Sequence, residues 1–283
     1  MAHGAVCLPG AFNALSALTA FKAGAKAVYL SGGAVTNCHL GAPDMGLLTL
    51  DEMAQSAARA CQAAPVPMIC DADTGFGETW NVIRTVIEME RAGLAGIHLE
   101  DQVMPKRCGH LDGKALVSPD AMEEKIRAAA AAKRDPSFLI IARTDARSVE
   151  GMGSAIQRAR RFVKAGADVI FPEGLGSREE FAEFRKAVPG PLLANMTEFG
   201  RTPLLTVKEF EELGYQLVIF PVSAMRVMLK AVQDFYTSLL QSGTQADWLD
   251  RMRTRAELYD LIDYQDYQLA EITWTENGPS TQF

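Results

Sequence analysis

Short apolar runs alternate with longer amphipathic segments along most of the chain. In eight of these runs most apolar residues are consecutive, as in strands that are buried on both faces of a parallel sheet. Alternating strands and helices build α/β folds, and eight units favour a closed barrel over an open sheet. We therefore predict an α/β fold, a (β/α)8 TIM-type barrel. The predicted strands are residues 4–9, 27–31, 67–71, 95–100, 138–143, 169–173, 191–195 and 217–221.

The end of the chain continues beyond the eighth predicted strand. Residues 224–240 have helical apolar periodicity, and residues 248–269 predict further helix rich in Tyr and Asp. No linker rich in Gly or Pro divides the chain, so we predict one barrel domain over 1–283 with extra C-terminal helices from about residue 224. A neighbouring subunit is one candidate for the surface that these helices cover.

Composition excludes several classes of function. The formal charge of −7 and the pI near 5.2 argue against nucleic-acid binding, which needs clustered Lys and Arg. No stretch is long and apolar enough to predict a membrane span, and no signal peptide is recognisable. The five cysteines are scattered without C-x-x-C spacing, which favours neither disulfides nor structural zinc and fits a reducing cytoplasm.

Acidic residues gather where predicted strands end. Asp71 and Asp73 follow the third strand with the spacing that places both on one side, and Glu100 ends the fourth. Active sites of TIM barrels lie at these carboxyl ends. Converging carboxylates without His or Cys favour Mg²⁺, with Mn²⁺ as a substitute. The alternative is that these acids cap helices or form salt bridges.

The second predicted strand is followed by Ser31, Gly32 and Gly33. Glycines permit close approach of a ligand and left-handed backbone, so this turn can form an anion-binding nest of backbone N–H groups. A tight turn without a ligand is the alternative.

The segment at 100–114 combines an isolated thiol with basic residues. Lys106, Arg107 and His110 surround Cys108, an electropositive setting that lowers a thiol pKa or places the thiol for proton transfer. Two glycines nearby allow the segment to act as a lid. A basic loop with an incidental cysteine is the alternative.

Six short motifs are spread over nearly the whole chain: Asp-Ala-Asp-Thr-Gly-Phe-Gly at 71–77, Glu-Asp-Gln at 100–102, Lys-Arg-Cys-Gly-His at 106–110, Ala-Arg-Thr-Asp-Ala at 142–146, Phe-Pro-Glu at 171–173 and Leu-Ala-Asn-Met-Thr-Glu-Phe-Gly at 193–200. In this order they resemble the motifs of the isocitrate lyase and phosphoenolpyruvate mutase superfamily. Within it, Gly-Thr-Gln at 243–245 and Met-Arg-Thr-Arg-Ala-Glu-Leu-Tyr at 252–259 resemble the branch that splits 2-methylisocitrate into pyruvate and succinate in propionate breakdown.

The resemblance implies a metal-dependent carbon–carbon lyase. Asp71 would bind Mg²⁺ directly, and Asp73, Glu100 and Asp44 would hold it largely through water. The ion would chelate the hydroxyl and a carboxylate of the substrate and acidify that hydroxyl.

The resemblance also assigns residues to a small di- or tricarboxylate substrate. The pyruvate-side carboxylate would be held by Arg143 with the Ser31 turn, and Cys108 would protonate the succinate carbanion. Tyr29 is one candidate base, although core packing is the alternative, and Glu173 would orient Arg143 or the substrate. The remaining predicted substrate contacts, mainly toward the succinate-side carboxylate, are Lys106, Arg107, Gly109, His110, Asn195 and Thr197.

Several alternatives stay open within this resemblance. The continuation His-Leu-Asp-Gly-Lys at 110–114 is also similar to 2,3-dimethylmalate lyases and carboxyphosphonoenolpyruvate mutases. A non-enzymatic scaffold or small-acid sensor on the same barrel is a further alternative. The superfamily fold implies a homotetramer, a dimer of dimers in which the final helix is swapped between partners.

Overall fold

The computed structural model describes residues 4–109, 111 and 113–277. The chain forms two compact units, one ending at Arg226 and the other beginning at Val227. The first unit contains eight parallel strands in the order β6-β5-β4-β3-β2-β1-β8-β7. The strands are β1 (Val6–Ala11), β2 (Val28–Leu30), β3 (Met68–Asp71), β4 (Gly96–Glu100), β5 (Leu139–Thr144), β6 (Val169–Pro172), β7 (Leu193–Asn195) and β8 (Leu217–Phe220).

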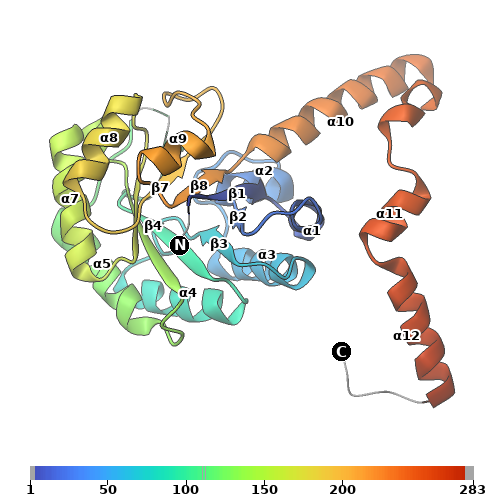
Figure 1. Ribbon diagram of the computed structural model, residues 1–283, viewed down its shortest axis with the longest axis horizontal. Coiled ribbons are helices and arrows are strands. Elements are labelled where there is room, and N and C mark those ends of the chain that lie inside the picture. Colours follow the sequence, from blue (N-terminus) through green and yellow to red (C-terminus); the bar gives the residue numbers. More distant parts are fainter. Residues whose placement is uncertain (1–3, 110, 112, 278–283) are drawn as a thin grey trace. The chain divides into compact units, whose positions relative to one another are not determined.

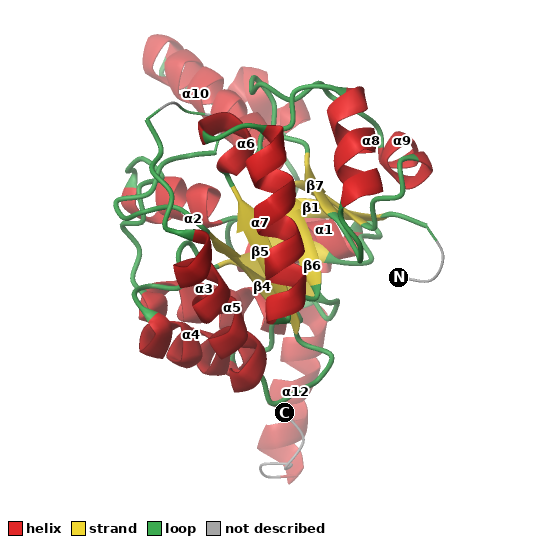
Figure 2. Ribbon diagram, turned by 90° about the vertical axis from the view of Figure 1, so that its left-hand side faces the viewer, coloured by secondary structure: helices red, strands yellow, loops and turns green. Residues whose placement is uncertain are grey.

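The sheet closes into a barrel between β6 and β7. Ile170 forms a parallel bridge with Leu192, just before β7, and its N–H donates to Pro191 O at 3.0 Å. Figure 2 shows α7 lying over strands of this barrel. The predicted barrel is confirmed, and each observed strand overlaps its predicted run.

Strand residues alternate between the barrel interior and the layer under the helices. Ile69, Ile141 and Phe171 belong to an interior cluster, whereas their neighbours Cys70, Ile140 and Ile170 pack with the helices. Both directions are apolar because both faces are covered, which explains the consecutive apolar runs. The same two-residue period decides which polar residues at the strand ends face inward.

Helices connect the strands around the outside of the barrel (Figure 1). Several begin at a sequence-encoded cap: Thr49 and Thr206 form capping boxes with Glu52 and Glu209. The helices of the first unit are α1 (Ala14–Lys22), α2 (Gly32–Leu40), α3 (Leu50–Ala63), α4 (Thr79–Arg91), α5 (Pro119–Ala132), α6 (Ala146–Val149), α7 (Met152–Ala165), α8 (Arg178–Ala187) and α9 (Val207–Glu212).

The second unit consists of helices. Helix α10 (Ser223–Ser242) begins in the first unit and continues into the second. It is followed by η1 (Ala246–Arg251), α11 (Arg255–Leu261) and α12 (Tyr264–Asn277), so the predicted C-terminal helices are present. Large apolar side chains on this unit are exposed, including Leu240 at 86% and Tyr267 at 70%. Among the described residues, no helix combines the length and the apolarity that a membrane crossing needs.

Candidate active site

Polar side chains gather at the carboxyl end of the barrel. Ile69 faces the interior, and Asp71 follows it two residues later on β3. In the same way Ile141 is followed by Arg143 on β5, and Phe171 by the nearby Glu173 after β6. Because side chains two apart on a strand face the same way, these three strands of the barrel turn charged residues toward its mouth.

The acids predicted to bind metal surround the ammonium group of Lys106. Its Nζ lies 2.6 Å from Asp44 Oδ1 and 2.7 Å from Asp73 Oδ1, and the side chain is 2% exposed. Asp71 and Glu100 also interact electrostatically with this lysine. The four acids raise the pKa of Lys106 well above its ordinary value, although burial alone would lower it. Lys106, predicted to touch substrate, is therefore placed within the acid cluster.

Burial and charge separate the pKa values of the two aspartates. Burial would raise the pKa of Asp71, but His98, Lys106, Arg143 and the Asp73 N–H outweigh it and hold the value at about 2. Burial raises the pKa of Asp73 to about 6 against the opposing effect of Lys106. The cluster therefore places an acid with a lowered pKa beside one with a raised pKa.

Glu100 supports the prediction of a cation at this place. Both of its carboxyl oxygens are buried and accept no hydrogen bond from the described residues, and Oε2 has an ion pair with Arg143 Nη1 at 3.3 Å. A buried carboxylate lacking hydrogen bonds is costly unless a cation or water completes its surroundings. In the described part of the chain, no three or more acidic, His or Cys side chains stand together as a metal site. The donor chemistry nevertheless fits Mg²⁺, since the buried carboxylates of Asp71 on β3 and Glu100 on β4 both interact with the same cationic group, Lys106.

The Ser31 turn is the start of helix α2. Ser31 is its N-cap and accepts the N–H of Ala34 at 3.3 Å, and Gly32 and Gly33 form the first helical turn. Both glycines are helical, so neither adopts the left-handed backbone that glycine permits. Their lack of a side chain is needed for another reason: a Cβ on Gly32 would lie 2.8 Å from Asp71 Oδ2, and one on Gly33 would lie 3.0 Å from Asp44 Oδ2. The glycines let a helix N-terminus, which favours anions, approach the acid cluster.

Arg143 is the cationic centre of the mouth. Its Nε and Nη2 donate to Asp145 at 3.0 and 3.2 Å, and Nη1 lies 3.5 Å from Glu173 Oε2. Its guanidinium also lies over the ring of Phe171, 5.2 Å from the centroid. Two hydrogen bonds to one carboxylate fix the plane of the guanidinium, which prepares it for a carboxylate ligand.

A second buried acid supports this arginine. Asp101 accepts from the N–H of Asp145 at 2.9 Å and from Thr144 Oγ1 at 2.7 Å, and it forms an ion pair with Arg158 of α7 at 3.3 Å. Our prediction assigned no role to Asp101, Asp145 or Arg158. The acids were visible at strand ends, but Arg158 lies on a helix far along the chain.

Glu173 and Asn195 form a pair across strands β6 and β7. Asn195 Nδ2 donates to Glu173 Oε2 at 3.1 Å, and the N–H of Gly174 donates to Oε1 at 2.8 Å. Asn195 Oδ1 is buried and has no hydrogen-bond partner among the described residues. Thr197 lies two residues further and is 9% exposed. The predicted substrate contacts Asn195 and Thr197 therefore share the mouth with Glu173.

Tyr29 is inside the barrel. Its hydroxyl lies 2.8 Å from His98 Nε2, and His98 lies 3.5 Å from Asp71 Oδ1. Burial, assisted by Asp71, raises the pKa of Tyr29 well above its ordinary value, and burial lowers the pKa of His98 to about 4. At neutral pH both are uncharged, so Tyr29 acts as a base only with a partner that receives its proton.

The predicted lid is a folded segment. Gln102 and Leu116 form an antiparallel bridge at its base, and the Gln102 side chain bonds both the N–H and the carbonyl of Arg107. At its tip, a Cβ on Gly109 would lie 2.4 Å from Glu173 Cγ and 2.6 Å from Arg143 Nη2. The segment is therefore seated on the barrel mouth.

Lys114, unassigned at the sequence level, holds the tip of the lid. Its Nζ donates to Gly109 O and lies 3.5 Å from Asp145 Oδ1. Cys108 is partly buried beside this contact. The predicted substrate contact His110 lies outside the described residues. Cys108 therefore directly precedes the residue that packs against Arg143 and Glu173.

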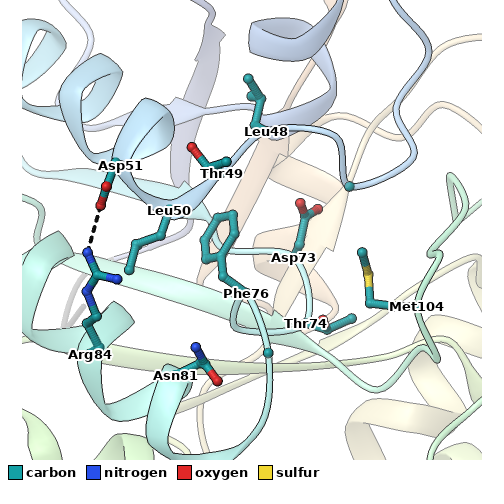
Figure 3. Close-up of a pocket in the computed structure, with 12 residues that line it drawn as sticks. Leu48, Thr49, Leu50, Asp51, Asp73, Thr74, Phe76, Asn81, Arg84 and Met104 are labelled. Carbon is teal, nitrogen blue, oxygen red and sulfur yellow. Dashed lines mark hydrogen bonds and ion pairs between the residues drawn. The ribbon is translucent and has the colours of Figure 1, made fainter.

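A cavity of about 410 Å³ lies beside the mouth (Figure 3). Asp73, Phe76 and Met104 line it, together with the exposed ion pair Arg84–Asp51 at 2.9 Å. Neither Arg143 nor Glu173 lines it. The cavity therefore borders the outer side of the acid cluster, while Gly109 packs on the mouth itself.

Comparison with known proteins agrees with this arrangement. A 2-methylisocitrate lyase of Aeropyrum pernix is 56% identical over 93% of this chain and 84% of its own length. The Escherichia coli 2-methylisocitrate lyase is 47% identical over 92% of this chain and 88% of its own.

Solved structures share the fold. A 2,3-dimethylmalate lyase has a TM-score of 0.91 at 35% identity, covering 97% of this chain and 91% of its own. A phosphonopyruvate hydrolase in complex with oxalate and Mg²⁺ has a TM-score of 0.87 at 27% identity, covering 96% and 94%. The sequence model described as phosphoenolpyruvate phosphomutase matches residues 1–240. The chain therefore belongs to the phosphoenolpyruvate phosphomutase family.

Proposed function

We propose that this protein is a Mg²⁺-dependent lyase that cleaves 2-methylisocitrate into pyruvate and succinate, as a step of propionate breakdown. The observation that carries the proposal is the seat of the lid, because Gly109 packs on Arg143 and Glu173 and so brings the adjacent Cys108 to the charged mouth. The choice of substrate is supported by the curated 2-methylisocitrate lyases at 56% and 47% identity.

Asp71 would bind Mg²⁺ directly, and Asp73, Glu100 and Asp44 would hold it through water. When bound, the ion supplies chelation of the substrate hydroxyl and carboxylate and acidifies the hydroxyl, a role that Mn²⁺ also fits. Glu100 supports this set because its buried oxygens lack hydrogen bonds among the described residues. The hydrolase structure with oxalate and Mg²⁺ supports the same ion.

Arg143 would hold the pyruvate-side carboxylate with the N-terminus of α2 at Ser31, Gly32 and Gly33. Asn195, whose buried Oδ1 lacks a hydrogen bond from the described residues, and Thr197 would contact the succinate side under the lid residues Gly109 and His110. Lys106 and Arg107 would close the lid over both. Substrate entry requires the lid to open, since Gly109 lies against Arg143 in the closed arrangement.

In the proposed reaction the substrate hydroxyl loses its proton and the carbon–carbon bond breaks. The bonding electrons pass to the succinate carbon, which takes the proton of the Cys108 thiol, and solvent later returns a proton to the thiolate. The base would be Tyr29 with His98 as its partner, since their side chains are 2.8 Å apart. Glu173 would orient Arg143 and Asn195 rather than exchange protons.

The exposed apolar side chains of the second unit support a homotetramer, a dimer of dimers with swapped C-terminal helices. Leu240 and Tyr267, exposed at 86% and 70%, are the kind of residue that a partner buries. The five cysteines, all among the described residues, form no disulfide, which supports a reducing cytoplasmic environment. Light scattering of the purified protein would measure the subunit count.

A second candidate is 2,3-dimethylmalate cleavage, favoured by the solved lyase of that specificity at 35% identity and by the His-Leu-Asp-Gly-Lys lid. A carboxyphosphonoenolpyruvate mutase is a weaker candidate, because such chemistry has no need for the thiol.

Pyruvate release would be measured with Mg²⁺ on 2-methylisocitrate, isocitrate and 2,3-dimethylmalate, for the wild type and Cys108→Ser. We expect 2-methylisocitrate to be preferred and the activity to be lost with Cys108→Ser or EDTA. Preference for 2,3-dimethylmalate would make that compound, and not 2-methylisocitrate, the substrate. Full activity of Cys108→Ser would exclude the thiol as the acid.

A further inference from the structure

The loop that follows Asp71 and contains Asp73 has an unusual backbone. Between β3 and α4 it contains Asp73 at φ +47° and Phe76 at φ +56°, both non-glycine residues in the left-handed region. Such conformations persist only where surrounding contacts enforce them. The loop therefore needs specific partners to hold Asp71 and Asp73 at the mouth.

Those partners are donors that bond to the carbonyl groups of the loop. Asp73 O accepts the N–H of Glu100 at 2.9 Å, and Gly75 O accepts Thr85 Oγ1 of α4 at 3.0 Å. The carbonyls of Thr74 and Gly77 both accept from Lys125 Nζ of α5, at 3.2 and 2.8 Å. One lysine thus joins the two carbonyls that flank the left-handed Phe76.

Lys125 is buried at this contact. The residue is 6% exposed, and its nearest carboxylate is the exposed Glu78 at 3.9 Å. A lysine on a helix surface ordinarily extends its ammonium into water, so burying it against two carbonyls indicates a specific role. Thr74, Phe76 and Gly77 also line the cavity, so this side of the loop faces open space, which does not hold its backbone conformation.

We propose that Lys125 is a positioning residue for the metal site, which holds the β3–α4 loop so that Asp71 and Asp73 point into the barrel mouth. In this role Lys125 would act through the loop carbonyls of Thr74 and Gly77, without touching metal or substrate. This inference rests on the proposed metal site, and its test also includes a measurement that needs no metal.

The chain offers a matched control on the same helix. Lys133, the C-cap of α5, is also largely buried and donates to Phe138 O at 3.0 Å and to Asp168 at 2.8 Å. Those contacts lie at the N-terminal ends of β5 and β6, the face of the barrel that serves stability. Lys133→Met therefore removes a similar contact at the opposite end.

The experiment compares full-length wild type, Lys125→Met, Lys125→Arg and Lys133→Met. Hydrogen exchange of residues 72–78 is measured without metal, and the Kd for Mn²⁺ is measured by electron paramagnetic resonance without substrate. We expect Lys125→Met to speed exchange in this loop and to weaken Mn²⁺ binding by about 10-fold to 100-fold, the range for outer-shell residues. Lys125→Arg should keep the exchange rate of the loop and the Mn²⁺ affinity close to those of the wild type. Lys133→Met should lower the melting temperature but leave the exchange rate and the Mn²⁺ affinity nearly unchanged.

Unchanged exchange in Lys125→Met would overturn the proposal, as would faster exchange with unchanged Mn²⁺ affinity or an equal loss of affinity in Lys133→Met. Should Lys125→Met fail to fold, Lys125→Gln, whose shorter amide cannot span both carbonyls, takes its place. A wild type that binds no Mn²⁺ would refute the proposed metal site, while the exchange measurement would still decide whether Lys125 holds the loop.

Discussion

Removal of the Lys106 ammonium should destabilise the protein in a pH-dependent way. In Lys106→Met the two aspartates at 2.6 and 2.7 Å lose their counterion. Asp44 is 25% exposed in its side chain and regains water, whereas Asp73 at 10% does not. Removing one partner of a buried ion pair costs about 3–5 kcal/mol. We expect a loss of stability at the low end of this range, about 3 kcal/mol, because protonation of Asp73 removes its uncompensated charge.

The pH dependence follows from Asp73. Its pKa in the folded protein is about 6, above the ordinary 3.8, so the folded state binds more protons than the unfolded state between these values. Stability from this group is therefore present below about pH 4 and lost as the pH rises through 6. Lys106 lowers this pKa, so in the variant the loss continues to higher pH. The difference between wild type and variant should therefore be larger at pH 8 than at pH 5.

Thermal unfolding followed by circular dichroism at pH 5, 6.5 and 8 would measure the effect. A loss of about 3 kcal/mol corresponds to a melting temperature lower by roughly 6–12 °C in a protein of this size. Mg²⁺ at about 100 times its Kd stabilises by about 2.7 kcal/mol and should protect the variant at least as well as the wild type. Lys114→Met, a second buried lysine of the lid, is the control. An equal loss at pH 5 and pH 8 would refute the reasoning.

Three further substitutions test the mouth. Tyr29→Phe removes the 2.8 Å contact with His98 and should lower the free energy of unfolding by about 1 kcal/mol. In steady-state assays kcat should fall by about 10²- to 10⁴-fold if the phenol is the base. Gly32→Ala places a Cβ 2.8 Å from Asp71 Oδ2 and should weaken Mn²⁺ binding in titrations by about 10-fold or more, whereas Gly153→Ala, with open space around its Cβ, should not. Asp145→Asn leaves one of two Arg143 hydrogen bonds, so kcat/KM should fall by about 10-fold or more.

Much of this architecture was readable from local sequence. The eight strands lie where apolar runs occur, because burial on both faces leaves the same signature in every strand. Asp71, Asp73 and Glu100 were found for a related reason: parallel strands end at one edge of a barrel, so polar residues at those ends lie close together. The resemblance to the superfamily then added Asp44, Arg143 and Glu173 and implied the roles of the site residues.

The groups that hold this site in place were not readable. Lys125 stands in an alanine-rich helix and resembles any exposed lysine, yet its ammonium reaches carbonyls 48 and 51 positions earlier in the chain. Lys106 reads as part of a basic loop, but folding of the lid places it among four acids. Arg158 similarly supports Asp101 from α7.

The sequence by itself thus determined the strands, the barrel and the set of acids at its mouth, because apolar periodicity and strand ends are properties of short segments. Only the tertiary structure decided which cation neutralises those acids and which side chains fix the loops around them. Long flexible lysine and arginine side chains reach their partners through space, and the distance along the chain carries no record of that contact.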